Sequence, residues 1–329
     1  MPIPQELLDF IRRRDKFLIV GHKEPDGDCV GSQLALTSAL RRLGKEAVPC
    51  SAGPFKRPEI IPYQDRFISE VDEIRRVGAC AIILDCSALC RTGEIAKALE
   101  GLPTALIDHH IAGQRVPGEF DGPVFLEPSA PAVTVMVFAL IEALGLTPTP
   151  EEADLLLFGL CTDTGFFRHI DETGAETFGY VSRMVRLGAS PKRAFQRING
   201  GKSLNSRYLL GIQLSRVRAY FGGKLLFTSE EYAETQRFGL EGRDSDSLYQ
   251  LLQAVDGAEA IAVIRQETPE NCTIALRSRD KIDVSAIAAD FGGGGHKNAA
   301  GISIAGTIDD LRPRILGAFE RVFPSDAQG

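Results

Sequence analysis

The sequence lacks an apolar run long enough to cross a bilayer, which takes about 18 residues, and it has no CxxC pair. Residues 1–17 place apolar side chains at helical spacing but interrupt them with Glu6, Asp9 and Asp15, so we expect no secretory signal. Seven scattered cysteines argue against a disulfide framework or a structural zinc and favour a reducing compartment. These absences predict a cytoplasmic protein without a membrane partner.

The sequence also lacks an excess of basic residues. It has 37 Lys and Arg against 44 Asp and Glu, a net charge of −7. A protein that follows a long phosphate backbone usually carries a basic face, because its affinity comes largely from counterion release. The acidic balance therefore favours small anions and short strands over long duplex nucleic acid.

The 329 residues are enough for two domains of about 100–200 residues each. In the first half, short apolar runs at 17–20, 81–84 and 105–107 have the length and branching of buried strands. They alternate with helical patterns at 30–43, 132–144 and 151–160. This alternation predicts an α/β domain over 1–188, a mostly parallel sheet flanked by helices.

The pattern changes after about Gly188. The basic stretch 190–207 leads us to expect an interdomain connector at 189–212. The sequence predicts two hairpins, at 217–228 and 260–279, and a helix at 284–291. We therefore expect a smaller α+β domain over 213–325.

Asp and His follow the apolar runs of the first domain. In an open parallel sheet, groups just beyond the carboxyl ends of strands converge on one crevice. The sequence pattern predicts that six residues meet there: His22, Asp26, Asp28, Asp85, His109 and Asp163. Each Asp alone is more often a turn or capping residue, and each His alone is more often structural. The set together favours a metal site.

Four carboxylates in one crevice repel each other unless cations neutralise them. Two divalent cations would match the four aspartates. Carboxylate and imidazole ligands without cysteine suit Mn²⁺, with Mg²⁺ possible. Two such ions can clamp a phosphoryl group and activate water, and Asp85, alone after its strand, is the expected bridging ligand.

A second group of residues points to phosphate binding. Residues 292–295 are four consecutive glycines, followed by His296 and Lys297. Glycine backbones can bring N–H groups close to phosphate oxygens, although glycine clusters can also mark simple turns. Arg277 and Arg279 alternate along an expected strand and would share one face, which could equally be a plain exposed face.

These motifs together resemble the DHH family of phosphoesterases. The segment GHKEPDGDCVGS at 21–32, Asp85, DHH at 108–110 and Asp163 are similar to its four motifs. GGGGHKNAAG at 292–301 resembles the signature of the associated C-terminal substrate domain. The most similar subgroup is the short bacterial proteins that degrade very short oligoribonucleotides and dephosphorylate adenosine 3′,5′-bisphosphate.

The resemblance implies a role for each matching residue. His22, Asp26 and Asp85 would hold one Mn²⁺, and Asp28, Asp85, His109 and Asp163 the other. His110 would face the substrate phosphate, and Asp108 would orient a histidine. The resemblance further implies a homodimer and an active-site cleft between the domains, with these substrate contacts: Arg279, Gly293, Gly294, Gly295, His296 and Lys297.

One departure from the family pattern concerns substrate preference. Many relatives carry small hydroxyl residues beyond the third motif, where this chain has PSAPA at 128–132. We expect a Mn²⁺-dependent phosphoesterase that hydrolyses RNA of about two to five nucleotides and dephosphorylates adenosine 3′,5′-bisphosphate to AMP. The alternatives are a phosphodiesterase for linear or cyclic dinucleotides, a single-strand exonuclease of the RecJ type, and an inactive nucleotide-binding sensor.

Overall fold

The apolar runs of the first half form a parallel sheet. A computed structural model describes residues 1–110, 119–170, 174–279 and 281–323, and the chain divides into two units, Met1–Gly201 and Lys202–Gly329. In the first unit the five strands run in the order β2-β1-β3-β4-β5, all parallel. The strands are β1 (Lys16–Val20), β2 (Glu46–Cys50), β3 (Cys80–Leu84), β4 (Thr104–Asp108) and β5 (Val124–Leu126).

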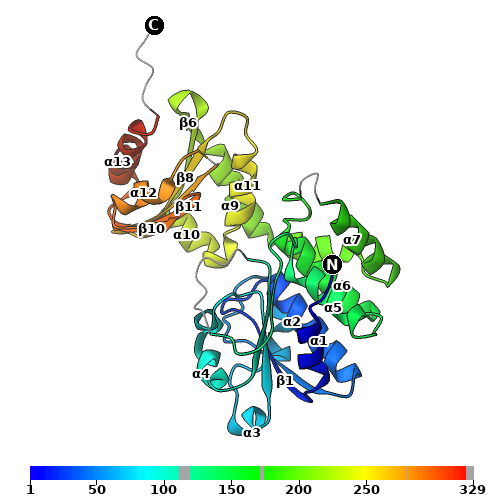
Figure 1. Ribbon diagram of the computed structural model, residues 1–329. Helices are drawn as coiled ribbons and strands as arrows, with labels where there is room; N and C mark the ends of the chain where they lie inside the picture. Colours follow the sequence, from blue (N-terminus) through cyan, green and yellow to red (C-terminus); the bar gives the residue numbers. More distant parts are fainter. Residues whose placement is uncertain (111–118, 171–173, 280, 324–329) are drawn as a thin grey trace. The chain divides into compact units, whose positions relative to one another are not determined.

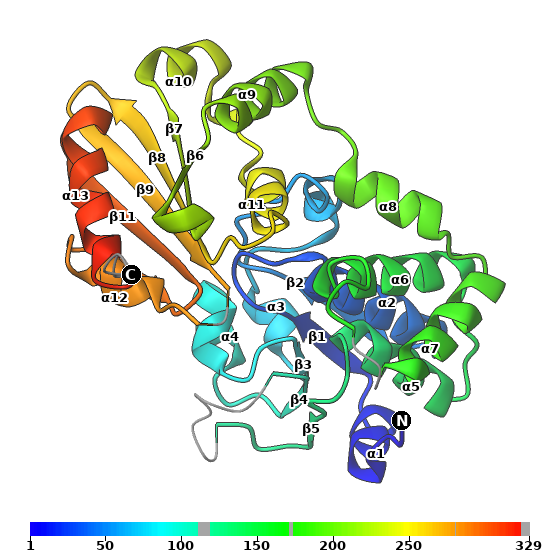
Figure 2. The same cartoon turned by 90° about the horizontal axis from the view of Figure 1, so that it is seen from above.

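Helices flank this sheet on both faces, as Figures 1 and 2 show. Ile82 and Leu84 of β3 belong to the core cluster under α1, α2, α5 and α6, whereas Ala81 and Ile83 belong to the cluster that includes α4. The helices are α1 (Gln5–Arg12), α2 (Gly27–Arg42), α3 (Glu73–Arg76), α4 (Ala96–Leu99), α5 (Val133–Ala143), α6 (Pro150–Asp163), α7 (Ala175–Arg186) and α8 (Pro191–Asn199), with 3₁₀ turns η1 (Ile61–Arg66) and η2 (Leu89–Ile95). The predicted flanked, mostly parallel sheet is confirmed.

Helices α2 and α6 pack closely because glycines line their contact. A Cβ atom on Gly31 would lie 2.6 Å from the Leu155 carbonyl oxygen, and one on Gly159 would lie 2.9 Å from the Gly27 carbonyl oxygen. Both distances are too short for any larger side chain. The close approach brings the carboxyl end of α6 beside the amino end of α2, where the motif residues lie.

The second unit has a mixed sheet of six strands in the order β10-β11-β9-β8-β7-β6. All neighbouring strands are antiparallel except β7 and β8. The strands are β6 (Arg218–Tyr220), β7 (Leu225–Glu230), β8 (Ala260–Thr268), β9 (Asn271–Ser278), β10 (Gly294–His296) and β11 (Ala299–Ala305). Both predicted hairpins, β6–β7 and β8–β9, are present.

Strand β8 illustrates how this sheet separates two cores. Ala262 and Ile264 face the cluster with α12 and α13, while Ile261 and Val263 face the cluster with α9 and α11. Figure 2 shows these helix pairs on opposite faces. The helices are α9 (Leu204–Ser215), α10 (Tyr232–Phe238), α11 (Ser245–Gln253), α12 (Val284–Ala289) and α13 (Ile308–Glu320), with 3₁₀ turns η3 (Phe221–Gly223) and η4 (Leu240–Gly242).

Two predicted element boundaries near motif residues were wrong. The helix expected to end at Leu160 continues to Asp163, the last residue of α6. The strand expected to include Arg279 ends at Ser278. The glycine run is partly regular, because Gly294 to His296 form β10 in a hairpin with β11. The basic segment 190–207 is largely helical, with α8 and the start of α9.

Within the described residues, no helix combines the length and the apolar character needed to cross a membrane.

Candidate metal centre

The strand order places the motif residues at one point of the sheet. Strand β1 has β2 on one side and β3 on the other, so the strand order switches direction at β1, which is a topological switch point. Ligands of open parallel sheets bind beyond the carboxyl ends of the strands at such a point. His22 follows β1, Asp85 follows β3, and Asp108 is the last residue of β4. The predicted convergence is thus present in the first unit.

Asp85 lies at the centre of this group. Its side chain is buried, Oδ2 lies 3.5 Å from Nε2 of His22, and Oδ1 lies 3.8 Å from Nε2 of His109. Its backbone has φ +61°, a left-handed conformation that only a minority of residues other than glycine adopt. Local strain of this kind persists where the surrounding structure enforces it, often at functional sites.

Both inner histidines are held by backbone carbonyl groups. Nδ1 of His22 lies 2.8 Å from the Lys23 oxygen, and Nδ1 of His109 lies 3.0 Å from the Ala130 oxygen. A carbonyl accepts only from an N–H, so in each ring Nδ1 is the donor and Nε2 points toward the carboxylates. Because the backbone carbonyl of Ala130 makes this contact, holding the His109 ring does not require a side-chain hydroxyl at position 130.

The Nε2 atom of His109 is the clearest indication of a missing partner. It is shielded from solvent and makes no hydrogen bond to any described residue. Buried polar atoms are rarely left unpaired, and imidazoles that bind metals typically donate their other N–H to a carbonyl or carboxylate. The ring therefore fits a metal ligand.

Asp26 and Asp28 combine capping with their place in the crevice. Oδ1 of Asp26 accepts the backbone N–H groups of Asp28 and Cys29 and so caps α2. The fully buried Asp28 carboxylate accepts the N–H groups of Val133 (2.6 Å) and Thr134 (2.9 Å) at the start of α5. Each carboxylate thus accepts backbone N–H groups at the start of a helix, as an isolated Asp commonly does, and also faces the other acidic groups.

Asp163 enters from α6. Its Oδ2 lies 3.5 Å from Nε2 of His109, and its side chain keeps 29% of its surface exposed. The partial exposure leaves this edge of the group accessible to a solvent molecule or a substrate.

Asp108 and His110 form a separate pair beside Asp85. Nδ1 of His110 donates to Oδ1 of Asp108 at 2.7 Å, and the same oxygen accepts the backbone N–H of His109. His110 is exposed while Asp108 is fully buried. The carboxylate therefore fixes the orientation of a solvent-facing imidazole.

Three groups of possible ligand atoms, each within 4.8 Å, occur among the described residues. Asp85 and His109 each belong to two of them, which makes the site continuous. The groups are His22, Cys29 and Asp85; Asp85, His109 and His110; and Asp28, His109 and Asp163. Cys29 was missed by the sequence analysis. Its position three residues after Asp26, in the first turn of α2, was the available signal.

Electrostatic interactions in the crevice change several pKa values. Burial, with the neighbouring Asp163 and Asp26 charges, raises the pKa of Asp28 to about 6. Burial and the Asp28 charge also raise the pKa of Asp85. Burial raises the pKa of Asp163. These carboxylates resist carrying charge together, which is the situation that bound cations relieve.

His22 and Asp26 act as an ion pair in this setting. Burial alone would lower the pKa of His22, but the acidic groups of Cys29, Asp26 and Asp85 outweigh it and raise the pKa. Burial would raise the pKa of Asp26, but the nearby His22 imidazole, whose Nε2 lies 3.9 Å from Oδ1 of Asp26, lowers it to about 2.

The predicted substrate residues belong to the second unit. Arg279 is exposed and donates to the Gln253 carbonyl, whereas Arg277 is half-buried with its guanidinium 4.4 Å from the centre of the Tyr249 ring. In the sheet register Arg277 pairs with Ala299, and Ala299 pairs with His296. Directly paired residues project to the same face, so Arg277 and His296 share one face with the small Ala299 between them.

The glycine run makes close backbone contacts. A Cβ atom on Gly293 would lie 2.3 Å from the Gly301 oxygen, and one on Gly295 would lie 2.4 Å from the Ala299 oxygen. Gly292, at φ +74°, follows the end of α12. Tight packing of the β10–β11 hairpin thus explains part of the glycine run, and a phosphate-binding role stays a prediction.

Comparison with known proteins gives matches along both units. Residues 16–160 match the DHH family, N-terminal domain, and residues 226–323 match the DHHA1 domain. The chain is 33% identical over 311 residues to the bifunctional oligoribonuclease and PAP phosphatase NrnA of Thermus thermophilus, covering 91% of this chain and 88% of that protein.

Solved structures show the same fold. An exopolyphosphatase-related protein from Bacteroides fragilis is similar with a TM-score of 0.81 and 24% identity, covering 98% of each chain. The exonuclease RecJ bound to manganese is similar with a TM-score of 0.51 and 18% identity, covering 99% of this chain and 96% of that one.

Proposed function

The chain belongs to the DHH family, and from this membership we propose a Mn²⁺-dependent phosphoesterase for short nucleotides. The observation that carries the proposal is the buried, unpartnered Nε2 atom of His109, which faces the carboxylates of Asp85 and Asp163. An imidazole nitrogen beside two carboxylates is an arrangement that can bind a divalent cation. A purely structural role would have left the nitrogen paired.

Two Mn²⁺ ions, with Mg²⁺ as an alternative, are the cofactors that we propose. The protein side chains that would hold them are His22, Asp26, Asp28, Asp85, His109 and Asp163. Asp85 is the candidate bridging ligand because it lies within 4 Å of both inner histidines. When bound, such ions supply Lewis-acid activation of water and charge neutralisation at the phosphoryl group.

The role that we propose for His110 follows from its pair with Asp108. The Asp108 carboxylate stabilises the imidazolium form and leaves Nε2 pointing away from the pair. In that state the ring can donate a hydrogen bond to a phosphate oxygen or give a proton to the leaving oxygen. Asp108 thereby orients the general acid without touching the substrate.

Substrate contacts from the second unit remain proposals. We assign them to His296, Lys297, Gly293 to Gly295 and an arginine at the end of β9. The motif comparison favours Arg279, while the stacked and half-buried position of Arg277 favours that residue. Guanidinium groups suit phosphate because their fork geometry matches two oxygens.

The substrate class that we propose is RNA of a few nucleotides, together with adenosine 3′,5′-bisphosphate. The likeness to NrnA, the net charge of −7 and the two-unit organisation support short over long strands. The family membership keeps a dinucleotide phosphodiesterase as the second candidate. We also propose a cytoplasmic homodimer, which light scattering and fractionation would test.

An activity panel with Mn²⁺ tests the function directly. It compares adenosine 3′,5′-bisphosphate, RNA of two to about ten nucleotides and cyclic dinucleotides under one condition, since site size governs strand binding. We expect the highest kcat/KM on the bisphosphate and on the shortest RNA. A preference for the longest strands, or binding without turnover, would contradict the proposal.

A further inference from the structure

Arg277 is held by an aromatic ring instead of an acid. Its guanidinium lies 4.4 Å from the centre of the Tyr249 ring, and its Nη1 donates a hydrogen bond to the Leu276 carbonyl oxygen (2.9 Å). No carboxylate of residues 1–110, 119–170, 174–279 or 281–323 lies within ion-pair distance of it. A half-buried cation stacked in this way is oriented but keeps its charge available for an anion.

Tyr249 is in turn held by burial and by a hydrogen bond from Arg265. The ring is 93% buried in the core under α11, and its hydroxyl oxygen accepts from Nη2 of Arg265 at 3.3 Å. The same Nη2 atom donates to Oγ of Ser245 at 3.0 Å. Arg265 therefore ties the ring to the start of its own helix and to strand β8.

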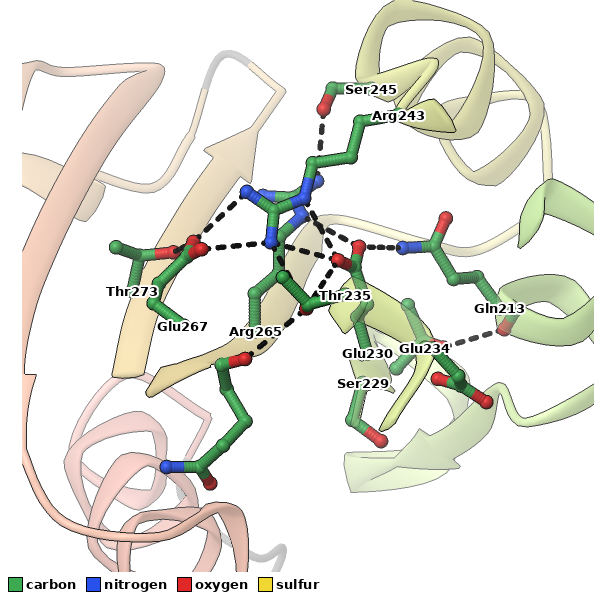
Figure 3. Close-up of polar contacts among 12 residues, drawn as sticks. Gln213, Ser229, Glu230, Glu234, Thr235, Arg243, Ser245, Arg265, Glu267 and Thr273 are labelled. Carbon is green, nitrogen blue, oxygen red and sulfur yellow. Dashed lines mark hydrogen bonds and ion pairs between the residues drawn. The ribbon is translucent and has the colours of Figure 1, made fainter. Parts of the chain in front are cut away.

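The Arg265 side chain is part of a buried ionic network, shown in Figure 3. Glu230, fully buried on β7, accepts from Nε of Arg243 at 2.8 Å and lies 3.5 Å from Nε of Arg265. Arg243 also binds both carboxylate oxygens of Glu267, at 3.1 and 2.9 Å. Gln213 (2.9 Å) and Thr235 (3.0 Å) also donate hydrogen bonds to Glu230.

The charges of this network balance within itself. Two glutamates face two arginines, Arg243 and Arg265, so no negative charge is left over for Arg277. The network thus provides rigidity without neutralising the neighbouring cation. The charges are paired even though Nε of Arg265 makes no hydrogen bond among the described residues, and moving any member would leave a buried charge unpaired.

We propose that Tyr249 is a positioning residue for phosphate binding. Glu230 anchors Arg265, Arg265 fixes the Tyr249 ring, and the ring holds the Arg277 guanidinium on the sheet face that it shares with His296. The anion is a phosphate group of the short nucleotide substrate. The inference rests on the proposed function, because it assigns a role to a side chain near its substrate contacts.

The test uses the full-length protein with Mn²⁺ and adenosine 3′,5′-bisphosphate. Y249L removes the stacking surface, and we expect KM to rise about three- to tenfold with kcat within about twofold. Y249F keeps the stacking ring but removes the hydroxyl that accepts from Arg265, so KM should rise clearly less than in Y249L. In an R277A background, Y249L should add no further change, since its effect passes through that arginine.

The matched control is F238L, another substitution of a buried aromatic ring in the same unit. We expect it to lower the melting temperature like Y249L but to leave KM unchanged. An equal rise of KM in F238L, an additive effect of Y249L with R277A, or an unchanged KM in a folded Y249L protein would each overturn the inference.

A spectroscopic measurement separates this inference from the proposed function. The Arg277 side-chain N–H signal, assigned by its loss in R277A, should show a ring-current shift in the wild-type and Y249F proteins but not in Y249L. If the wild-type protein hydrolyses no nucleotide, the proposed function fails and this signal still decides whether Tyr249 holds Arg277.

Discussion

Nε2 of His109 lies 3.5 Å from Oδ2 of Asp163. This buried nitrogen makes no hydrogen bond within the described part of the chain. A cation between the two groups would satisfy both. The relationship can be tested without an enzyme assay, because a ligand that binds only the folded protein raises its stability.

We predict that Mn²⁺ at about 100 times its Kd raises the melting temperature of the chelator-treated protein by about 5–10 °C. H109A should lose most of this shift, because it removes a ligand shared by two of the possible metal groups. H169A, a substitution of an exposed histidine in the same unit, is the control and should keep the shift. Equal shifts in both variants would mean that His109 does not bind the metal.

Asp85 should be essential for turnover but dispensable for folding. We predict that D85N lowers Mn²⁺-dependent kcat by at least about a hundredfold. Losing a group that only orients a metal ligand typically costs about 10- to 100-fold, and losing a ligand should cost at least as much. Asn is preferred to Ala here, because Asn tolerates the left-handed backbone of this position. Circular dichroism should confirm an unchanged fold, and D256N on the exposed surface is the control. Turnover within about twofold of wild type would rule out the bridging role.

The pH dependence of metal-free stability follows from the raised pKa values of Asp28, Asp85, Asp163 and His22. Asp28, with a pKa of about 6 in the folded state, holds a proton that the unfolded chain has released above about 4. Its effect is to lower stability as pH rises through that window. The raised pKa of His22 acts in the same direction, because its stabilising charge is lost as pH rises through the folded value. Asp26, with a pKa of about 2, contributes stability that is lost only in strong acid.

We therefore predict that the melting temperature of the chelator-treated protein is higher at pH 5 than at pH 8, and that saturating Mn²⁺ removes or reverses this trend. Metal binding must displace the protons, so the affinity for Mn²⁺ should weaken below about pH 6 and binding should release protons. Calorimetry in two buffers of different ionisation enthalpy measures the release. Proton-free binding at pH 6 would show that these groups are not the ligands.

His110 and Asp108 should control the alkaline limb of the rate profile. The hydrogen bond to Asp108 raises the pKa of His110, so a role as general acid predicts activity that falls as pH rises through that pKa. We predict that D108N lowers kcat about 10- to 100-fold and moves this limb to lower pH, because the imidazolium loses its carboxylate. H110A should remove the limb altogether. A D108N profile with an unshifted limb would assign the limb to another group.

The sequence predicted the centre of the site better than its edges. His22, Asp85 and His109 follow buried strands, and parallel strand ends converge whatever the details of packing. The place of Asp163 inside α6 was not predicted, because the apolar run of that helix stops at Cys161, two residues before the helix ends. Cys29 was not singled out, although its position in the first turn of α2, three residues after Asp26, was an available signal. The contacts of Arg277 depend on Tyr249, 28 positions earlier, which no local pattern connects.

Arg277, in β9, and Arg279, just after it, give the last prediction, because the structure favours the first and the family motif favours the second. R277A should raise KM about 10- to 100-fold with little change in kcat, the loss expected for a charged hydrogen bond to phosphate. R279A should raise KM less, because its exposed guanidinium has the Gln253 carbonyl as its partner and no ring to hold it. R277K tests geometry separately from charge, since lysine keeps the charge but cannot stack or bind two oxygens in one plane. If KM rises more in R279A than in R277A, Arg279 is the main substrate contact, as the family motif predicts. Tyr249 would then have no phosphate-binding arginine to position.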